Sequence, residues 1–171
     1  MEERKGIITL RGNPLTLLGP ELKPGDEAPD FEALTVDMLP FALSSLKGKV
    51  VIISSVPSLD TSVCDTETRK FNERAAELGD DVEILTVSMD LPFAQKRWCG
   101  AAGVDRVKTL SDHRTASFGE AYGVLIKELR LLARVVFVVD REGVVRYIQV
   151  VEEVGDEPDY DAVINAVKEL I

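Results

Sequence analysis

Two cysteines, Cys64 and Cys99, are the most reactive side chains of this sequence, and they stand 35 positions apart. A thiol that loses its proton becomes a nucleophile, so the pair could carry redox chemistry. Two buried thiols without such a role would instead behave as small apolar side chains. A domain of this length needs no covalent staple, and a permanent structural disulfide is rare in cytosolic proteins. Composition by itself leaves the reactive and the inert interpretation open.

The segment before Cys64 places this cysteine in the first turn of a helix. It connects a β-branched run at residues 50–55 to a helical pattern that extends from about 62 to 78. Free N–H groups and the positive end of the helix dipole favour an anion there, so the thiol should lose its proton more easily. Thr61 can place its hydroxyl beside the sulfur. Alternatively, Cys64 is a small apolar residue on an inward face and Thr61 is only a helix cap.

Arg134 is a charged residue within an apolar stretch of the sequence. It stands between the apolar residues 131–133 and the apolar run 135–139. Arginine is rarely buried unless it is paired, and its charge persists at any working pH. It could therefore hold an anion such as a thiolate. A side chain that extends to solvent from a strand end is the other interpretation.

Hydrophobic periodicity predicts alternating strands and helices around these residues, ending in an antiparallel hairpin. Asp90 is expected to cap the helix that carries Cys99, with Pro92 in its first turn and with Gly100 and Gly103 weakening its end. An α/β sheet with helices on both faces follows. Strands are predicted at 7–10, 15–18, 31–36, 41–43, 50–55, 82–88, 107–110, 135–139 and 144–150, and helices at 62–78, from Pro92, at 117–122, and over the stripe Tyr160, Val163, Ile164, Val167, Leu170 and Ile171.

Length and composition indicate one globular domain over residues 1–171, with 45% hydrophobic and 29% charged residues. Thirty acidic and twenty basic side chains give a formal charge of −10, which argues against nucleic acid and anionic membranes as partners. No apolar run approaches the ~18–20 residues that cross a bilayer. Residues 1–12 are charged and lack the apolar core of a secretion signal, so we expect a cytoplasmic protein.

The spacing Pro-x-x-x-Thr-x-x-Cys, filled by Pro57, Thr61 and Cys64, resembles the active-site signature of the peroxiredoxins. Further segments resemble the thiol peroxidase branch of that family, the atypical 2-Cys peroxiredoxins. They follow one another in the family's order, from about residue 8 to the C-terminus. These segments are Gly12-Asn13-Pro14, Pro57-Ser58-Leu59-Asp60-Thr61-Ser62-Val63-Cys64, Arg69-Lys70-Phe71-Asn72, Asp90-Leu91-Pro92-Phe93-Ala94-Gln95, Cys99-Gly100 and Glu157-Pro158-Asp159-Tyr160-Asp161.

The resemblance implies a thioredoxin-like fold with an N-terminal β-hairpin and assigns the site residues. Cys64 would be the peroxidatic cysteine and Cys99 the resolving cysteine. Thr61 would hydrogen-bond the sulfur and the incoming peroxide, Arg134 would reach into the same pocket, and Pro57 would fix the active-site loop.

The resemblance also implies a cycle and its partners. Hydrogen peroxide or an organic hydroperoxide would be reduced to water or an alcohol through a Cys64 sulfenic acid and an intramolecular Cys64–Cys99 disulfide. Thioredoxin would reduce that disulfide, the protein would be a homodimer in antioxidant defence, and no metal or organic cofactor would be needed.

Two other functions are compatible with two cysteines. A dithiol–disulfide exchanger or redox-regulated binding protein usually carries a Cys-x-x-Cys pair, which this sequence lacks. A peroxide sensor uses the same first step as the peroxidase and is not separated from it by the sequence.

The two cysteines are expected on different helices. Packed helix axes lie ~8–10 Å apart, whereas a disulfide needs Cα atoms within ~7 Å. We therefore predict that the helix ends around Cys64 and Cys99 partly unwind when the disulfide forms.

Overall fold

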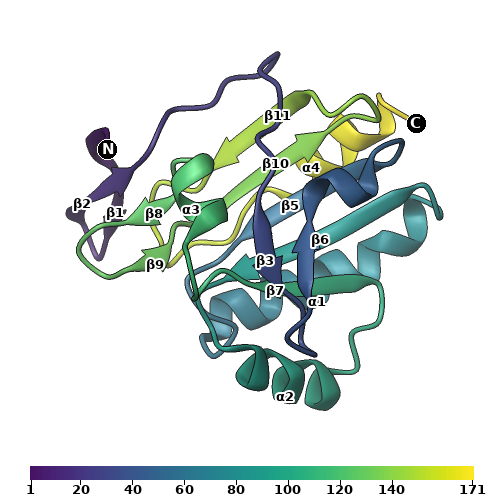
Figure 1. Ribbon diagram of the computed structural model, residues 1–171, viewed down its shortest axis with the longest axis horizontal. Helices are drawn as coiled ribbons and strands as arrows, with labels where there is room; N and C mark the ends of the chain where they lie inside the picture. Colours follow the sequence, from purple (N-terminus) through teal and green to yellow (C-terminus); the bar gives the residue numbers. More distant parts are fainter.

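The computed structural model describes residues 1–171 and contains a seven-stranded and a four-stranded sheet (Figure 1). The seven strands lie in the order β11-β10-β5-β6-β7-β3-β4 and the four in the order β1-β2-β8-β9. The strands are β1 (Glu3–Leu10), β2 (Asn13–Leu18), β3 (Glu32–Leu34), β4 (Pro40–Ala42), β5 (Val50–Ser55), β6 (Val82–Ser88), β7 (Val107–Ser111), β8 (Leu125–Ile126), β9 (Leu131–Leu132), β10 (Val135–Val139) and β11 (Val145–Val150). The helices are α1 (Ser62–Arg74), α2 (Pro92–Ala102), α3 (Ser117–Ala121) and α4 (Tyr160–Lys168), with 3₁₀ turns η1 (Leu43–Leu46) and η2 (Ala75–Glu77).

Buried β-branched strands form the middle of the large sheet. β5, β6 and β7 are parallel, and every residue of β5 is buried. β10 runs antiparallel to both β5 and β11 and is also buried throughout. Strands covered on both faces are expected to be nearly continuous apolar runs. β10 is apolar throughout, and β5 is apolar up to the buried Ser54 and Ser55. The carboxyl end of β5 therefore leads directly into the segment that carries Cys64.

Each face of the large sheet has its own core. The core on the α1 and α4 side includes Phe71, Val138 and Ile164, and the core on the α3 side includes Leu85, Phe118 and Phe137. In Figure 1, α3 lies in front of the sheet and α1 behind it. The predicted α/β sheet with helices on both faces is confirmed.

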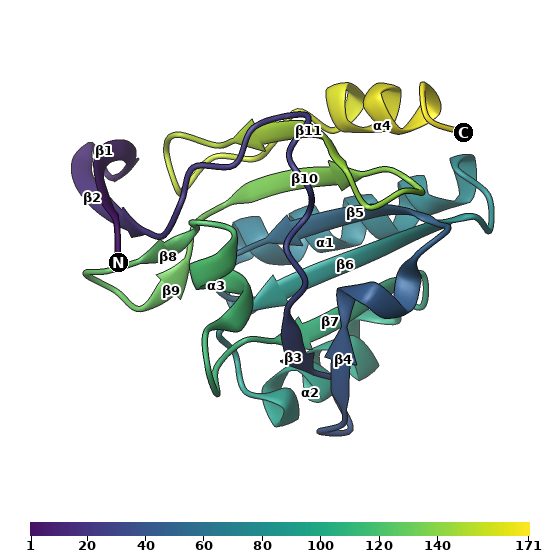
Figure 2. The ribbon, with the colours of Figure 1, turned by 45° about the horizontal axis from the view of Figure 1, so that its top comes forward.

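The predicted N-terminal hairpin is also confirmed, because β1 pairs antiparallel with β2. Figure 2 shows this hairpin at one end of the molecule, next to β8 and β9. Those two strands were not predicted. Each has only two residues, which is too short for a pattern of period two to be recognised.

Two sequence predictions need correction. Asp90 does not cap α2: the N-cap is Leu91, which makes no side-chain hydrogen bond. The Asp90 carboxylate instead accepts hydrogen bonds from Ser58 and Leu59 in the loop before α1 and from Ser88 at the end of β6. Ile171 does not join the buried stripe of α4, because that helix ends at Lys168 and leaves Ile171 51% exposed.

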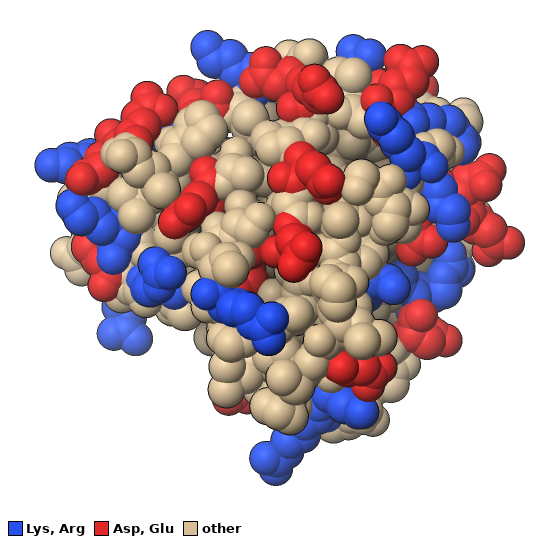
Figure 3. Space-filling model, viewed as in Figure 1, with Lys and Arg blue, Asp and Glu red and all other residues tan.

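Charged side chains of both signs cover the surface. On the face drawn in Figure 3, acidic and basic residues are interspersed rather than separated into one patch of each kind. None of the helices combines the length and the apolar character needed to span a bilayer.

Asp112 has a buried carboxylate that anchors the first turn of α3. It accepts hydrogen bonds from the N–H groups of Phe118 and Gly119 at 3.0 and 2.8 Å. Burial raises its pKa from 3.8 to about 6, although the two N–H groups act in the opposite direction. Between these values the folded chain holds a proton that the unfolded chain has released, so this group's contribution to stability falls as the pH rises.

We expect the stability of the wild type, relative to that of Asp112→Asn, to decrease by on the order of 2 kcal/mol between about pH 4 and pH 6.5. The amide of the variant does not titrate, so other carboxylates cancel in the difference. Urea denaturation of both proteins at the two pH values measures it. A difference that does not change with pH would contradict the expected titration.

Candidate active site

Cys64 lies in the first turn of α1, at the carboxyl end of the parallel strands. Its side chain is fully buried, in a small cluster with Val56, Leu59 and the half-buried Trp98. Pro57 is buried at the start of the loop that leads to it. The loop is tied to the sheet because the backbone N–H of Val56 donates to Val87 O at 3.0 Å. The carboxyl ends of parallel strands are where α/β sheets commonly place their sites.

Thr61 is the N-cap of α1. Its Oγ1 accepts a hydrogen bond from the backbone N–H of Cys64 at 3.3 Å and donates one to Ser58 O at 3.0 Å. The hydroxyl thus bonds the backbone of Cys64 rather than its sulfur. The side chain of Thr61 is exposed, whereas the Cys64 thiol is buried. A bond from Thr61 to an incoming peroxide stays a prediction.

Arg134 reaches the sulfur from the residue immediately before β10. Its Nη2 lies 3.3 Å from Cys64 Sγ and also donates to Val154 O at 2.9 Å. Nε donates to the same carbonyl at 3.1 Å. The side chain is only 2% exposed, so these acceptors replace water around its charge.

Glu67 completes the surroundings of Arg134 and was missed by the sequence analysis. Its Oε2 lies 2.6 Å from Arg134 Nη1, and its Oε1 accepts a hydrogen bond from Ser54 Oγ at 3.0 Å. Glu67 is fully buried on the inward face of α1, one turn after Cys64. A carboxylate on an otherwise apolar helix face was the available signal, since buried charges are almost always paired.

The charges of this cluster influence one another. Burial raises the pKa of the Glu67 carboxyl, while Arg134 lowers it by a smaller amount. Burial lowers the pKa of Arg134, but the charges of Glu67 and Cys64 raise it by more, and the net pKa stands above its ordinary value. The guanidinium therefore stays protonated and is shared between a carboxylate and a sulfur.

Asp90 fixes the loop between β5 and α1. Its carboxylate accepts hydrogen bonds from Ser58 Oγ at 2.7 Å, from the N–H of Leu59 at 2.8 Å and from Ser88 Oγ at 2.7 Å. These bonds connect the loop to the end of β6. The position of Cys64 is thus set by Asp90 on one side and by Arg134 on the other.

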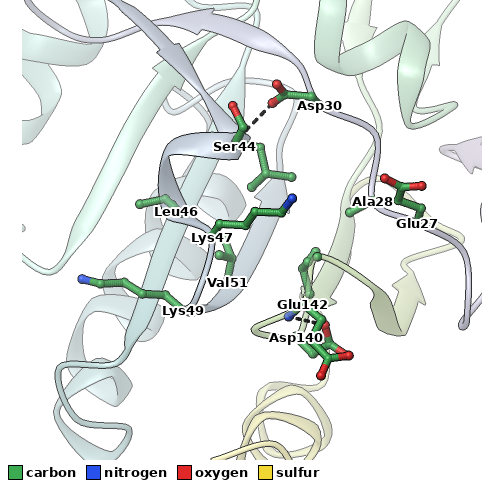
Figure 4. Close-up of a pocket in the computed structure, with 13 residues that line it drawn as sticks. Glu27, Ala28, Asp30, Ser44, Leu46, Lys47, Lys49, Val51, Asp140 and Glu142 are labelled. Atoms are coloured by element: carbon green, nitrogen blue, oxygen red, sulfur yellow. Dashed lines mark hydrogen bonds between the residues drawn. The ribbon is translucent and has the colours of Figure 1, made fainter.

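A hollow of about 150 Å³ elsewhere in the protein is not part of this site (Figure 4). It lies between η1 and the turn that joins β10 to β11, and it is lined by Lys47, Lys49, Asp140 and Glu142 among others. Lys49 precedes β5, whereas Cys64 follows that strand, so the hollow is at the opposite end of the sheet. No cysteine lines it.

Comparison with known proteins identifies the family. The family model described as Redoxin matches residues 23–164. A thiol peroxidase from Halalkalibacterium halodurans is 60% identical over 161 residues, which is 94% of this chain and 96% of that protein. The chain belongs to the redoxin family, in its thiol peroxidase branch.

Another thiol peroxidase, from Bacillus subtilis, is 58% identical over 164 residues, 96% of this chain and 98% of that relative. A crystal structure described as a peroxiredoxin-like protein from Aquifex aeolicus superposes with a TM-score of 0.92 at 47% identity, covering 100% of both chains. The predicted resemblance and the thioredoxin-like fold of a peroxiredoxin are confirmed, and the protein is an enzyme, a peroxidase of the peroxiredoxin type.

Cys99 of this thiol peroxidase lies on α2 and is not bonded to Cys64, since both cysteines are free. Its Sγ is half-buried and lies 3.3 Å from Thr109 Oγ1. The structure therefore brings Pro57, Thr61, Cys64 and Arg134 together and holds Cys99 on the neighbouring helix.

Replacing Arg134 by lysine tests whether peroxide reduction requires the several N–H donors of the planar guanidinium, in addition to its positive charge. Arg134→Lys keeps a positive charge but cannot contact Glu67, Val154 O and the sulfur at once. We expect the second-order rate constant for hydrogen peroxide to fall by roughly 10²–10³-fold. Stopped-flow peroxide consumption measures it.

Arg4→Lys is the matched control, because Arg4 also donates to two backbone carbonyls, those of Gly19 and Gly123, in the N-terminal part of the fold. It should leave the rate constant unchanged. Equal rate constants for Arg134→Lys and the wild type would show that the several donors of the guanidinium have no role.

Proposed function

We propose that this peroxidase reduces hydrogen peroxide and organic hydroperoxides with Cys64 as the attacking thiolate. The observation that carries the proposal is the buried contact of 3.3 Å between Arg134 Nη2 and Cys64 Sγ. A fixed positive charge beside a sulfur at a helix N-terminus favours the ionised thiol. The thiolate is the form that attacks peroxides.

In the first step, the Cys64 thiolate attacks the terminal oxygen of the peroxide in line with the O–O bond. An S–O bond forms, the O–O bond breaks, and hydroxide or alkoxide leaves and takes up a proton. Cys64 is oxidised to a sulfenic acid. The guanidinium of Arg134 stabilises the negative charge that develops on the oxygens, and the exposed hydroxyl of Thr61 hydrogen-bonds the peroxide as it enters.

In the second step, the thiol of Cys99 attacks the sulfenic acid. An S–S bond forms, the S–O bond breaks, and the hydroxyl leaves with the thiol proton as water. Both helices are intact in the structure, Cys64 is buried and the Cys99 sulfur contacts Thr109. The helix ends must therefore partly unwind before the sulfurs can meet.

A dithiol partner has to return two electrons to the disulfide, and we infer that thioredoxin does so. Recycling of this kind requires a reducing compartment, which supports a cytoplasmic location. We further propose that residues 1–171 act as one domain, that the protein forms a homodimer, and that its role is antioxidant defence. The names of the relatives, which are thiol peroxidases, support a thiol as the reductant.

Cysteine variants separate the two steps. Cys64→Ser should abolish peroxide consumption, because the nucleophile is lost. Cys99→Ser should consume one equivalent of peroxide and accumulate the Cys64 sulfenic acid, detectable by dimedone labelling and mass spectrometry. Normal recycling of Cys99→Ser by thioredoxin would contradict the resolving role.

The wild type should sustain NADPH oxidation with thioredoxin, thioredoxin reductase and hydrogen peroxide. One turnover only, with the disulfide left unreduced by thioredoxin, would indicate a sensor or a different reductant.

A further inference from the structure

Side chains of α1 hold the second half of α2 in place. Asp65 Oδ1 accepts a hydrogen bond from Trp98 Nε1 at 2.6 Å. Arg69, one turn further, donates from Nη1 to the carbonyl of Ala102 at 3.3 Å, and its guanidinium lies over the Trp98 ring, 5.7 Å from the centroid. We call these contacts of Asp65 and Arg69 with α2 the helix clamp.

Asn72 extends the same face of α1 and holds the chain just after α2. Its Oδ1 accepts hydrogen bonds from the N–H groups of Asp105 and Arg106 at 3.2 and 2.7 Å. Positions 65, 69 and 72 follow the helical spacing i, i+4, i+7, so all three side chains point to one side. Side chains of α1 therefore contact the second half of α2, from Trp98 to Ala102, and the segment that follows it up to Arg106.

The two halves of α2 are attached differently. Only Pro92 and Gln95 are buried, and both belong to the first half. Gln95 Nε2 donates to Ser88 Oγ at 3.0 Å and to the carbonyl of Leu110 at 2.8 Å, which fastens that half to the sheet. The second half contains Gly100 and ends at Gly103 in the left-handed conformation (φ 69°). A glycine inside a helix weakens it by ~1 kcal/mol relative to alanine.

The sulfur of Cys99 itself is held by few contacts in the reduced protein. The Cys99 sulfur makes one polar contact, with Thr109 Oγ1. The two clamp residues Asp65 and Arg69 also form an ion pair with each other, and their side chains are 33% and 45% exposed. Ion pairs exposed to this extent contribute little to the stability of the folded protein. The hydrogen bond from the indole to the Asp65 carboxylate is partly buried and charged, so it is the strong contact.

We propose that the Asp65–Trp98 hydrogen bond sets how fast Cys99 reaches oxidised Cys64, because it must break before the second half of α2 can move. Asp65 follows Cys64 and Trp98 precedes Cys99, so the bond joins the immediate neighbours of both cysteines. Gln95 keeps the first half of α2 in place and makes the segment between Gln95 and Trp98 the hinge. Trp98 is a positioning residue, since it acts through Cys99 and touches no reacting atom of the peroxide.

This inference rests on the disulfide step of the proposed function. In that step the S–S bond forms, the S–O bond of the sulfenic acid breaks, and water leaves with the thiol proton of Cys99. Holding Cys99 back lengthens the lifetime of the sulfenic acid. A longer lifetime allows a second peroxide to oxidise it further, to the sulfinic acid.

Trp98→Phe removes the indole N–H and keeps an aromatic ring against Cys64. Rapid mixing with hydrogen peroxide, acid quench, thiol alkylation and mass spectrometry give the rates of sulfenic acid and disulfide formation separately. We expect sulfenic acid formation at the wild-type rate and disulfide formation faster by roughly tenfold to a hundredfold, the factor associated with one hydrogen bond to a charged group. The peroxide concentration that inactivates half of the enzyme should rise accordingly.

Arg146→Gln is the matched control, because it breaks a charged hydrogen bond of 2.7 Å, to Asp140, far from α2 on the β11 hairpin. It should change neither rate. Where circular dichroism shows that Trp98→Phe is unfolded, Asp65→Asn, which leaves the indole only a neutral acceptor, is judged by its rate of disulfide formation. Disulfide formation at or below the wild-type rate in a folded variant would overturn the role of the bond while leaving the cycle intact. Absence of any Cys64–Cys99 disulfide in the wild type would overturn the cycle itself.

Discussion

The buried guanidinium of Arg134 requires a complete set of acceptors, and the elements around it supply them. A charge removed from water is tolerated only where hydrogen bonds and an opposite charge replace its hydration. Glu67 comes from α1, the Val154 carbonyl from the segment before α4, and the Cys64 sulfur from the first turn of α1. Removing one of these partners would leave the others uncompensated, so the cluster fixes α1 against β10 and places the sulfur at one defined position.

The surroundings of the second cysteine, Cys99, differ from those of Cys64 in burial and in charge. Cys64 lies in a fully buried, charged cluster, whereas Cys99 is half-buried on a helix that carries a glycine and few buried side chains. In the cycle that we propose, the first step needs a rigid arrangement of charges, and the second needs a sulfur that can move. The protein meets both needs by attaching α2 firmly at Gln95 and by a few side chains of α1 beyond it. Elements that move in function are generally drawn from the least stable part of a fold.

Much of the fold could be predicted because its strands and helices are long and strongly patterned. β10 is a continuous apolar run, β5 and β6 are mostly apolar, and the inward face of α1 has the expected helical spacing. β8 and β9 were missed because two residues carry no pattern. Asp90 was wrongly predicted to cap α2, since a capping rule considers only neighbours in sequence, while its partners Ser58 and Leu59 come from another loop. Glu67 was missed for the same reason, because its partner Arg134 stands 67 positions away.

The most direct test is the rate of Cys64 alkylation in Cys99→Ser, in which Cys64 is the only thiol. Iodoacetamide reacts with the thiolate alone, so its rate follows the ionised fraction. If the charge of Arg134 favours the anion, alkylation at neutral pH should be much faster in Cys99→Ser than in the folded double variant in which Arg134→Gln removes that charge. Equal rates in the two proteins would contradict a thiolate held by Arg134.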